Sequence, residues 1–248
     1  MSALRTGLLG KKLGMTQVFN AQGDLRPVTA IHAGPNVVIG HRTMEKDGYT
    51  AVRLGFGEKK LKRTSKPELG VFTKAGVAPQ RVVREVRVNE AELAKFEIGK
   101  AVALDAVFKA GTYVDVTGRS KGKGYQGVVK MHHMGGNRMT HGTHEFFRHG
   151  GSIGCRLTPG RVHKGKRMSQ HMGDVRKTVQ NVALVEILAD QNVLLLGGSV
   201  PGGKNGYVMI KNAVKRTGAI KARTGEVQEK SKNPMKASKA AAGAAKKK

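Results

Sequence analysis

Hydrophobic residues alternate with polar or small residues in several short stretches of the chain. Val52, Leu54 and Phe56 show this pattern, and Val114 and Val116 repeat it. A period of two puts successive side chains on opposite faces, so these stretches are predicted to be half-buried β-strands. Further strand signals lie at 27–33, 37–42, 178–188, 193–196 and 207–211.

Turn residues separate these strands, and helical signals are few. Gly34, Pro35 and Asn36 form a predicted turn, and glycine, proline and asparagine are frequent in 197–206. We predict one helix over 67–75, which ends before Gly76, and a second over 90–95. Many short strands with few helices are typical of a mainly β fold, either a barrel or a sandwich.

The segment 118–173 has a different composition from its surroundings. It holds 13 of the 34 glycines, seven of the nine histidines, and 11 Lys or Arg residues against one acid, Glu145. Its apolar side chains are too few to offset the conformational entropy of ordering its backbone. We therefore predict an extension that does not fold alone and that lies against an anionic surface.

The whole chain is strongly basic. Its 248 residues include 45 Lys or Arg and 17 Asp or Glu, which gives a formal charge of +28 and a pI of about 10.6. Such a charge opposes compaction unless a polyanion neutralises it. Aromatic residues make up 4% of the chain and tryptophan is absent, which argues against base stacking as the main binding device.

The sequence predicts no membrane span, no signal peptide and no disulfide bond. The longest apolar stretches, 182–189 and 193–196, fall far short of the roughly 18 residues of a membrane span. The first apolar patch, at 7–10, is too short for a signal peptide. A single cysteine, Cys155, excludes a disulfide framework and a cysteine-rich zinc site. We expect a protein of the cytoplasm.

The end of the chain, 215–248, forms a third region. It carries 11 Lys or Arg residues against Glu226 and Glu229, and its last residues are mainly alanine and lysine. This composition predicts a disordered basic tail, with a solvated helix as the alternative.

Three patterns resemble catalytic motifs, and each is weak. The segment 122–127 matches the dinucleotide motif G-x-G-x-x-G, but no second strand follows within a βαβ unit. His144 and His149 nearly match H-E-x-x-H, but their spacing is one residue too long for one helix face. Cys155 beside Arg156 suggests a nucleophile, but the segment offers almost no acid to orient a base. We predict no catalytic residue, no metal and no cofactor.

The remaining signal is the alternation of glycine with basic residues, as in 119–124 and 164–167. Glycine lets the backbone approach a phosphate closely, and lysine and arginine neutralise it. This combination favours a folded RNA that is recognised through its shape and phosphates. A free-standing nucleic-acid chaperone or packaging protein is the alternative.

Several short motifs occur in an order that resembles the family of bacterial large-subunit ribosomal protein three (the L-three family). They include Gly7-Leu8-Leu9-Gly10-Lys11-Lys12, Val114-Asp115-Val116-Thr117-Gly118, Ser120-Lys121-Gly122-Lys123-Gly124, Thr140-His141-Gly142, Gly151-Ser152-Ile153-Gly154, Thr158-Pro159-Gly160-Arg161 and Lys164-Gly165-Lys166-Arg167-Met168. The resemblance implies a six-stranded-type β-barrel domain made of 1–117 and 174–214, with 118–173 as an internal extension that threads ribosomal RNA.

The resemblance also implies a function and a set of site residues. The expected function is to bind large-subunit ribosomal RNA, to nucleate assembly of the subunit and to support the peptidyl transferase centre. Expected partners are that RNA and neighbouring ribosomal proteins, with no small-molecule substrate. The loop tip near that centre maps onto Gly154, Cys155, Arg156 and Leu157, and Leu157 stands where bacterial members often carry glutamine. The expected RNA-binding residues are Lys11, Lys12, Arg119, Lys121, Lys123, Lys130, Arg138, Arg148, Arg156, Arg161, Lys164, Lys166 and Arg167.

Overall fold

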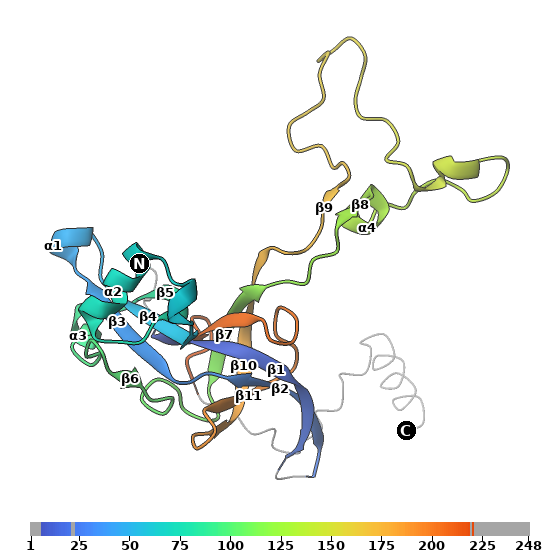
Figure 1. Ribbon diagram of the computed structural model, residues 1–248. Helices are drawn as coiled ribbons and strands as arrows, with labels where there is room; N and C mark the ends of the chain where they lie inside the picture. Colours follow the sequence, from blue (N-terminus) through green and yellow to red (C-terminus); the bar gives the residue numbers. More distant parts are fainter. Residues whose placement is uncertain (1–5, 21–22, 219, 221–248) are drawn as a thin grey trace, which may run out of the picture.

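The main body of the protein is a closed β-barrel. The computed structural model describes residues 6–20, 23–218 and 220, and in this part six antiparallel strands close on one another in the order β1-β12-β7-β10-β11-β2 (Figure 1). The strands are β1 (Gly7–Phe19), β2 (Leu25–His32), β7 (Tyr113–Arg119), β10 (Arg176–Leu188), β11 (Val193–Gly197) and β12 (Tyr207–Asn212). The predicted mainly β fold with a six-stranded barrel is confirmed.

A second, four-stranded sheet lies beside the barrel. Its order is β5-β4-β3-β6, formed by β5 (Gln80–Arg87), β4 (Ala51–Glu58), β3 (Asn36–Arg42) and β6 (Ala101–Val102). The short helices α1 (Met44–Asp47), η1 (Leu61–Arg63), α2 (Lys66–Ala75) and α3 (Glu90–Leu93) lie around this sheet in Figure 1. The sequence interpretation placed these strands in one barrel domain and did not distinguish the second sheet, because alternation shows that a strand has a buried face without showing what covers it.

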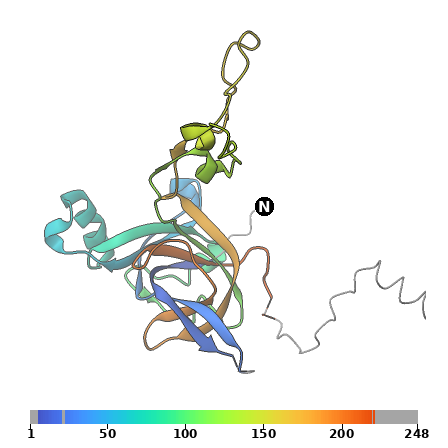
Figure 2. The same cartoon turned by 90° about the vertical axis from the view of Figure 1, so that its right-hand side faces the viewer.

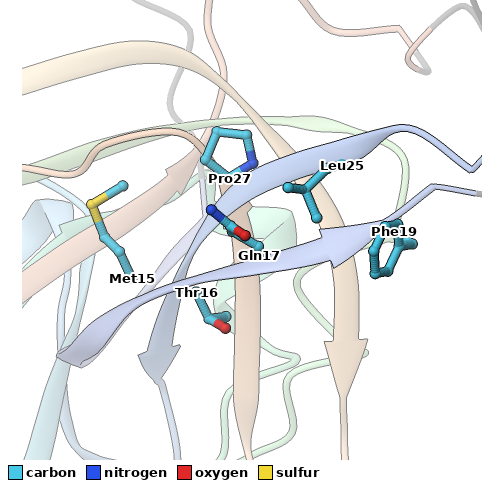
Figure 3. Close-up of a pocket in the computed structure, with 6 residues that line it drawn as sticks. All are labelled: Met15, Thr16, Gln17, Phe19, Leu25 and Pro27. Atoms are coloured by element: carbon cyan, nitrogen blue, oxygen red, sulfur yellow. The ribbon is translucent and has the colours of Figure 1, made fainter.

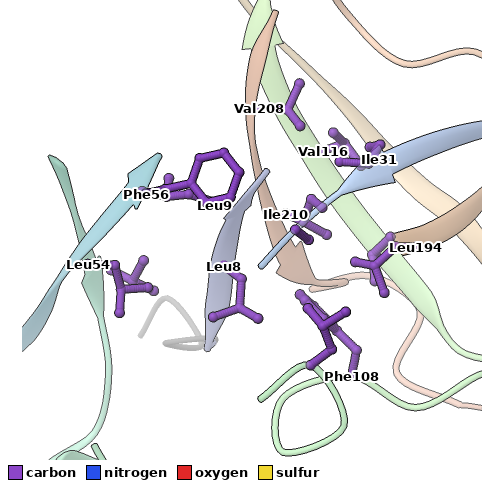
Figure 4. Close-up of a cluster of buried hydrophobic side chains, with 14 of the residues drawn as sticks. Leu8, Leu9, Ile31, Leu54, Phe56, Phe108, Val116, Leu194, Val208 and Ile210 are labelled. Atoms are coloured by element: carbon purple, nitrogen blue, oxygen red, sulfur yellow. The ribbon is translucent and has the colours of Figure 1, made fainter. Parts of the chain in front are cut away.

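Both sheets pack against one hydrophobic core. Ile31, Leu194 and Ile210 of the barrel and Leu54 of β4 are fully or almost fully buried in a single cluster, which Figure 4 shows. Phe108, from the loop before β7, is also completely enclosed. Because the core is shared, the barrel and the second sheet form one packed body.

Asn36 joins the second sheet to the barrel. Its side chain is fully buried at the start of β3. The amide oxygen accepts a hydrogen bond from the Leu9 N–H, and the amide nitrogen donates to the Leu9 carbonyl, both over 3.0 Å. One side chain thus pairs with β1 as a strand does, so that no buried polar group of Leu9 is left without a partner.

The strands that were predicted in this body lie close to their observed bounds, whereas β5 and β6 were not predicted. Helix α2 begins with Pro67 in its first turn and ends where Gly76 takes the left-handed conformation, at a φ of 67°. Glycine adopts this φ without a Cβ clash, which is why it ends helices. The second predicted helix is shorter than expected, four residues at Glu90–Leu93.

The segment between β7 and β10 projects away from the body, as both views in Figures 1 and 2 show. It contains β8 (Tyr125–Gln126), α4 (Val128–His132), η2 (His144–Arg148) and β9 (Gln170–His171). The sequence signals did not predict these elements. The predicted tail 215–248 falls mostly outside the described residues. In the described part of the chain, no helix has the length and apolar character to cross a membrane.

Candidate nucleic-acid interface

The two arms of the extension leave the barrel side by side. Strands β7 and β10 stay paired up to Arg119 and Arg176, and the Ser120 N–H then donates to the Val175 carbonyl over 2.9 Å. Further out, the Lys123 N–H donates to Met172, and β8 pairs with β9. The barrel therefore sets the direction in which the extension starts.

Arg119 and Asp174 close this base. The Arg119 guanidinium donates to the Asp174 side chain over 2.9 Å and to its backbone carbonyl over 3.1 Å. Arg119 is exposed, as expected of an RNA-binding residue, but its charge already has a carboxylate partner. It holds the two arms together across 55 residues of sequence.

A small cluster supports the middle of the extension. Val128 at the start of α4 is buried, and Gly150 lies against it. A ring nitrogen of His132 is 2.9 Å from the Met168 carbonyl, and the Asn137 N–H donates to the Phe147 carbonyl over 3.0 Å. These contacts join α4 to Met168 and the two ends of the η2 hairpin to each other, so this part of the extension contains local structure that the sequence signals did not predict.

Beyond this cluster the chain has no core of its own. Every residue from 148 to 171 is exposed, and the yellow part of this stretch forms the outer end of the extension in Figure 1. Leu157 is 87% exposed. Six cations lie in this stretch without any acid: Arg148, Arg156, Arg161, Lys164, Lys166 and Arg167. We call residues 148–171 the outer loop.

Six of the eleven predicted RNA-binding residues of the extension lie in the outer loop. Lys121, Lys123, Lys130 and Arg138, which precede the outer loop in the extension, are also exposed. Within the described ranges, none of these four nor any cation of the outer loop takes part in an ion pair. The predicted tip residues, Gly154, Cys155, Arg156 and Leu157, are all exposed in the outer loop.

Lys12 is placed differently from the expectation. It is 8% exposed, and its ammonium donates to the Val200 carbonyl over 2.9 Å and to the Gly202 carbonyl over 3.3 Å. Burial lowers the pKa of Lys12, and the positive charge of Lys121 lowers it further. This lysine supports the loop under the extension, so we leave it out of the proposed interface. Its neighbour Lys11 is half-buried.

A second exposed basic cluster was missed by the sequence interpretation. Lys60, Lys62, Arg63 and Lys66 are all exposed around η1 and the start of α2, while nearby Lys59 pairs with Glu68 over 2.7 Å. The signal was the run of cations in 59–66, which lies outside the segment on which the compositional argument concentrated. We call these four residues the second-sheet cluster.

The motifs that resemble catalytic sites stay separate in the structure. His144 begins the short 3-10 helix η2, and the ring of His149 packs near that of Phe146 at 4.9 Å. Cys155 is an exposed free thiol. Among the described residues, no three His, Cys, Asp or Glu side chains gather as metal ligands.

Comparison with known proteins gives a consistent result. The family model for ribosomal protein L3 matches residues 72–193. The large ribosomal subunit protein uL3 of Sorangium cellulosum is 47% identical over 212 residues, covering 86% of this chain and 91% of that protein. The uL3 of Oceanobacillus iheyensis is 49% identical over 209 residues, covering 84% and 98%. The uL3 of Anaeromyxobacter sp. strain K is 47% identical over 234 residues, covering 92% and 99%.

These matches identify the chain as a structural protein of the ribosome and not an enzyme. The chain belongs to the ribosomal protein L3 family. The resemblance noted from the sequence motifs is therefore confirmed. It extends beyond the motifs, because the alignments cover most of the chain.

Proposed function

We propose that the protein is a structural constituent of the large ribosomal subunit, in the cytoplasm, and that it binds large-subunit ribosomal RNA through its extension. The observation that carries the proposal is the outer loop, a run of exposed residues with six cations and no acid. Such a segment gains little from burial within its own chain. A polyanion neutralises its charges and gives its backbone a surface to follow.

The glycines of the outer loop support the same conclusion. Gly151, Gly160 and Gly165 have φ values of 69°, 65° and 78°, a conformation that residues with a Cβ rarely adopt. The loop thus takes left-handed backbone conformations at positions that carry no side chain. A narrow, irregular path of this kind suits crevices in a folded RNA better than the regular groove of a duplex.

We further propose that the loop tip, 154–157, lies beside the RNA of the peptidyl transferase centre and supports it, and that the protein acts early in assembly of the subunit. Arg156 is exposed beside Cys155 and can bind a phosphate through two parallel hydrogen bonds. The barrel anchors the loop from outside, and the paired base sets its direction. At that centre the protein supports the RNA and does not catalyse the reaction.

The single thiol of the chain provides the test. An iron chelate attached to Cys155 generates radicals that cut nearby RNA after reconstitution into subunits. We expect cuts in the RNA of the peptidyl transferase centre. The control carries Cys155→Ser with Leu61→Cys, which moves the reagent to η1, where Leu61 is 65% exposed. Cuts from Cys155 that stay remote from that centre would rule out the tip placement.

Membership of the subunit is tested separately. The unmodified chain should co-sediment with large subunits after a high-salt wash, and subunits reconstituted without it should assemble slowly. Arg156→Ala should change the response to drugs that bind the catalytic centre more than it changes the yield of subunits. Loss of the chain in the salt wash would favour a free-standing nucleic-acid chaperone instead.

A further inference from the structure

The hairpin formed by β1 and β2 extends beyond the rim of the barrel. Strand β1 pairs with β12 at Gly7–Lys11, whereas its pairing with β2 continues to Phe19 opposite Leu25. Strand β11 reaches β2 no further than Val28. Just after β11, the Gly198 N–H still donates to the Pro27 carbonyl over 2.9 Å. Beyond this bond the two strands leave the barrel as a ribbon made of residues 13–19 and 25–26, which we call the overhang (Figure 3).

One face of the overhang continues the inner face of the barrel. Thr29 and Ile31 are fully buried, and period two puts Pro27 and Leu25 on the same face of β2. The register places Gln17 opposite Pro27 and Phe19 opposite Leu25, so β1 contributes to this face as well. Apolar side chains thus continue along this face of the hairpin beyond the end of the barrel core.

These side chains are exposed where other core residues are covered. Met15 is 56% exposed, Phe19 73% and Leu25 51%, and with Pro27 they line a shallow groove that is open to solvent (Figure 3). Contiguous apolar patches of this kind on a soluble protein mark interaction surfaces.

The overhang also has an open backbone edge. On the side of β1 away from β2, the loop around Gly206 bonds to Lys12, and no backbone hydrogen bond to residues 13–19 follows among the described residues. Residues 13–19 carry no charge and no proline, two of the devices that protect a strand edge, and the one irregularity in their pairing with β2 lies at their start, between Lys12 and Gly14. A strand of another protein can use this edge.

Charge decides between the possible partners. The overhang carries one cation, Arg26, and Asp24 immediately before it offsets this charge, so the end of the hairpin, 13–26, is neutral within a chain of charge +28. Arg26 pairs opposite Val18, on the other face from Met15, Gln17 and Phe19. RNA finds no cation on the apolar face, and a second copy of the chain is repelled by the total charge.

We propose that the overhang is a docking surface for a different protein of the large subunit, one that presents apolar side chains together with an open strand edge. The partner covers Met15, Phe19 and Leu25 and completes the apolar layer that the barrel begins. This inference rests on the proposed function for the presence of such neighbours. It assigns the overhang to protein contact and the outer loop to RNA contact.

The test uses an introduced thiol in full-length protein that carries Cys155→Ser. Phe19→Cys is the probe, and Met44→Cys, at a residue 62% exposed on α1, is the matched control. In reconstituted subunits, maleimide labelling at the probe should be slower than in the free protein by about tenfold or more, because an interface excludes the reagent. The rate at the control position should change less.

The nature of the partner follows from a photocrosslinker attached at the probe position. We expect an adduct with another ribosomal protein that survives ribonuclease, and we expect Leu25→Ser to reduce its yield. An adduct that ribonuclease removes, or labelling as fast in subunits as in the free protein, would overturn the inference. Neither result touches the proposed function, which fails instead if the unmodified chain does not co-sediment with large subunits after a high-salt wash.

Discussion

The barrel body and the extension use the same kinds of residue in opposite ways. Of the six ion pairs within the described residues, five lie in the body and the sixth joins Arg119 to Asp174 at the base of the extension. Leucine shows the same contrast, since Leu196 is fully buried in the barrel and Leu157 is 87% exposed in the outer loop. The body pairs part of its charges and buries its core apolar groups within the chain. The outer loop leaves both to a partner.

This difference teaches where stability and recognition reside. The core of the body is packed without any partner, because its apolar side chains are buried against one another within the chain. In the outer loop, the interactions that decide the bound conformation come from outside. Substitutions in the two regions should therefore change different measurements, and four predictions test this division.

The largest effect on stability is expected from a leucine in the barrel core. Leu196→Ala removes buried methyl groups from a site that cannot fully collapse, so the free energy of unfolding should fall by about 2–5 kcal/mol. The matched change Leu157→Ala in the outer loop should alter it by about 0.5 kcal/mol or less. Urea unfolding of the two variants measures both values. Equal losses would mean that the outer loop packs as part of the body.

The second prediction concerns charge and RNA affinity. Replacing Arg161, Lys164, Lys166 and Arg167 together with alanine should weaken binding to a ribosomal RNA fragment and flatten its salt dependence. Each phosphate contact contributes about 0.7 to the slope of log affinity against log salt on single strands, so four lost contacts lower the slope by up to about 3.

The matched control removes the same charge from the second-sheet cluster. Alanine at Lys60, Lys62, Arg63 and Lys66 lowers the net charge by as much and leaves the extension intact. Its effect on the slope should be smaller. If the two quadruple variants lose affinity equally, net charge and not the outer loop determines binding, and the comparison between the regions fails at this point.

The third prediction tests the domain boundaries, which the sequence placed at 117–118 and 173–174. Trypsin should cut the free protein first at the exposed cations of the outer loop, because proteolysis requires backbone that opens locally. Bound RNA should slow these cuts and leave the others unchanged. Mass spectrometry of early fragments identifies the sites. Early cuts within 28–56, at the centre of the body, would contradict the assignment.

Much of the body was predictable from the sequence because its signals are local. Alternation at Val52, Leu54 and Phe56 depends on neighbouring residues only, and Gly76 ends α2 through its own backbone freedom. The second sheet was not predictable in this way. Whether β4 joins the barrel or a separate sheet depends on contacts such as that of Asn36 with Leu9, which are distant along the chain.

The candidate interface was predictable in outline and less so residue by residue. A count of cations located the extension, but it treats all cations alike. Lys12 turns inward to the Val200 carbonyl, and Arg119 meets Asp174, 55 residues further along the chain. Burial and pairing at these positions arise from the fold. The apolar overhang escaped notice for the same reason, since Met15 and Phe19 follow a normal strand pattern and become unusual only where the barrel ends.

The smallest expected effect contrasts two glutamates at different pH values. Glu85 accepts hydrogen bonds from the Tyr49 hydroxyl over 2.6 Å and from Arg42 and Arg53, each over 3.1 Å. The bond from Tyr49, followed by those from the two arginines, lowers the pKa of Glu85 in the folded protein although partial burial opposes this. A lowered folded pKa means that Glu85 contributes stability above its unfolded pKa of about 4.3, and that this contribution is lost as the pH falls through the folded pKa.

Glu85→Gln should therefore reduce the free energy of unfolding by on the order of 1 kcal/mol near neutral pH, and the difference from the parent protein should shrink below about pH 4. Glu145→Gln in the extension is the control, because Glu145 is exposed and takes part in no ion pair among the described residues. Urea unfolding at several pH values measures both differences. If the loss for Glu85→Gln persists unchanged at low pH, the charge of the Glu85 side chain is not the source of its contribution to the free energy of unfolding.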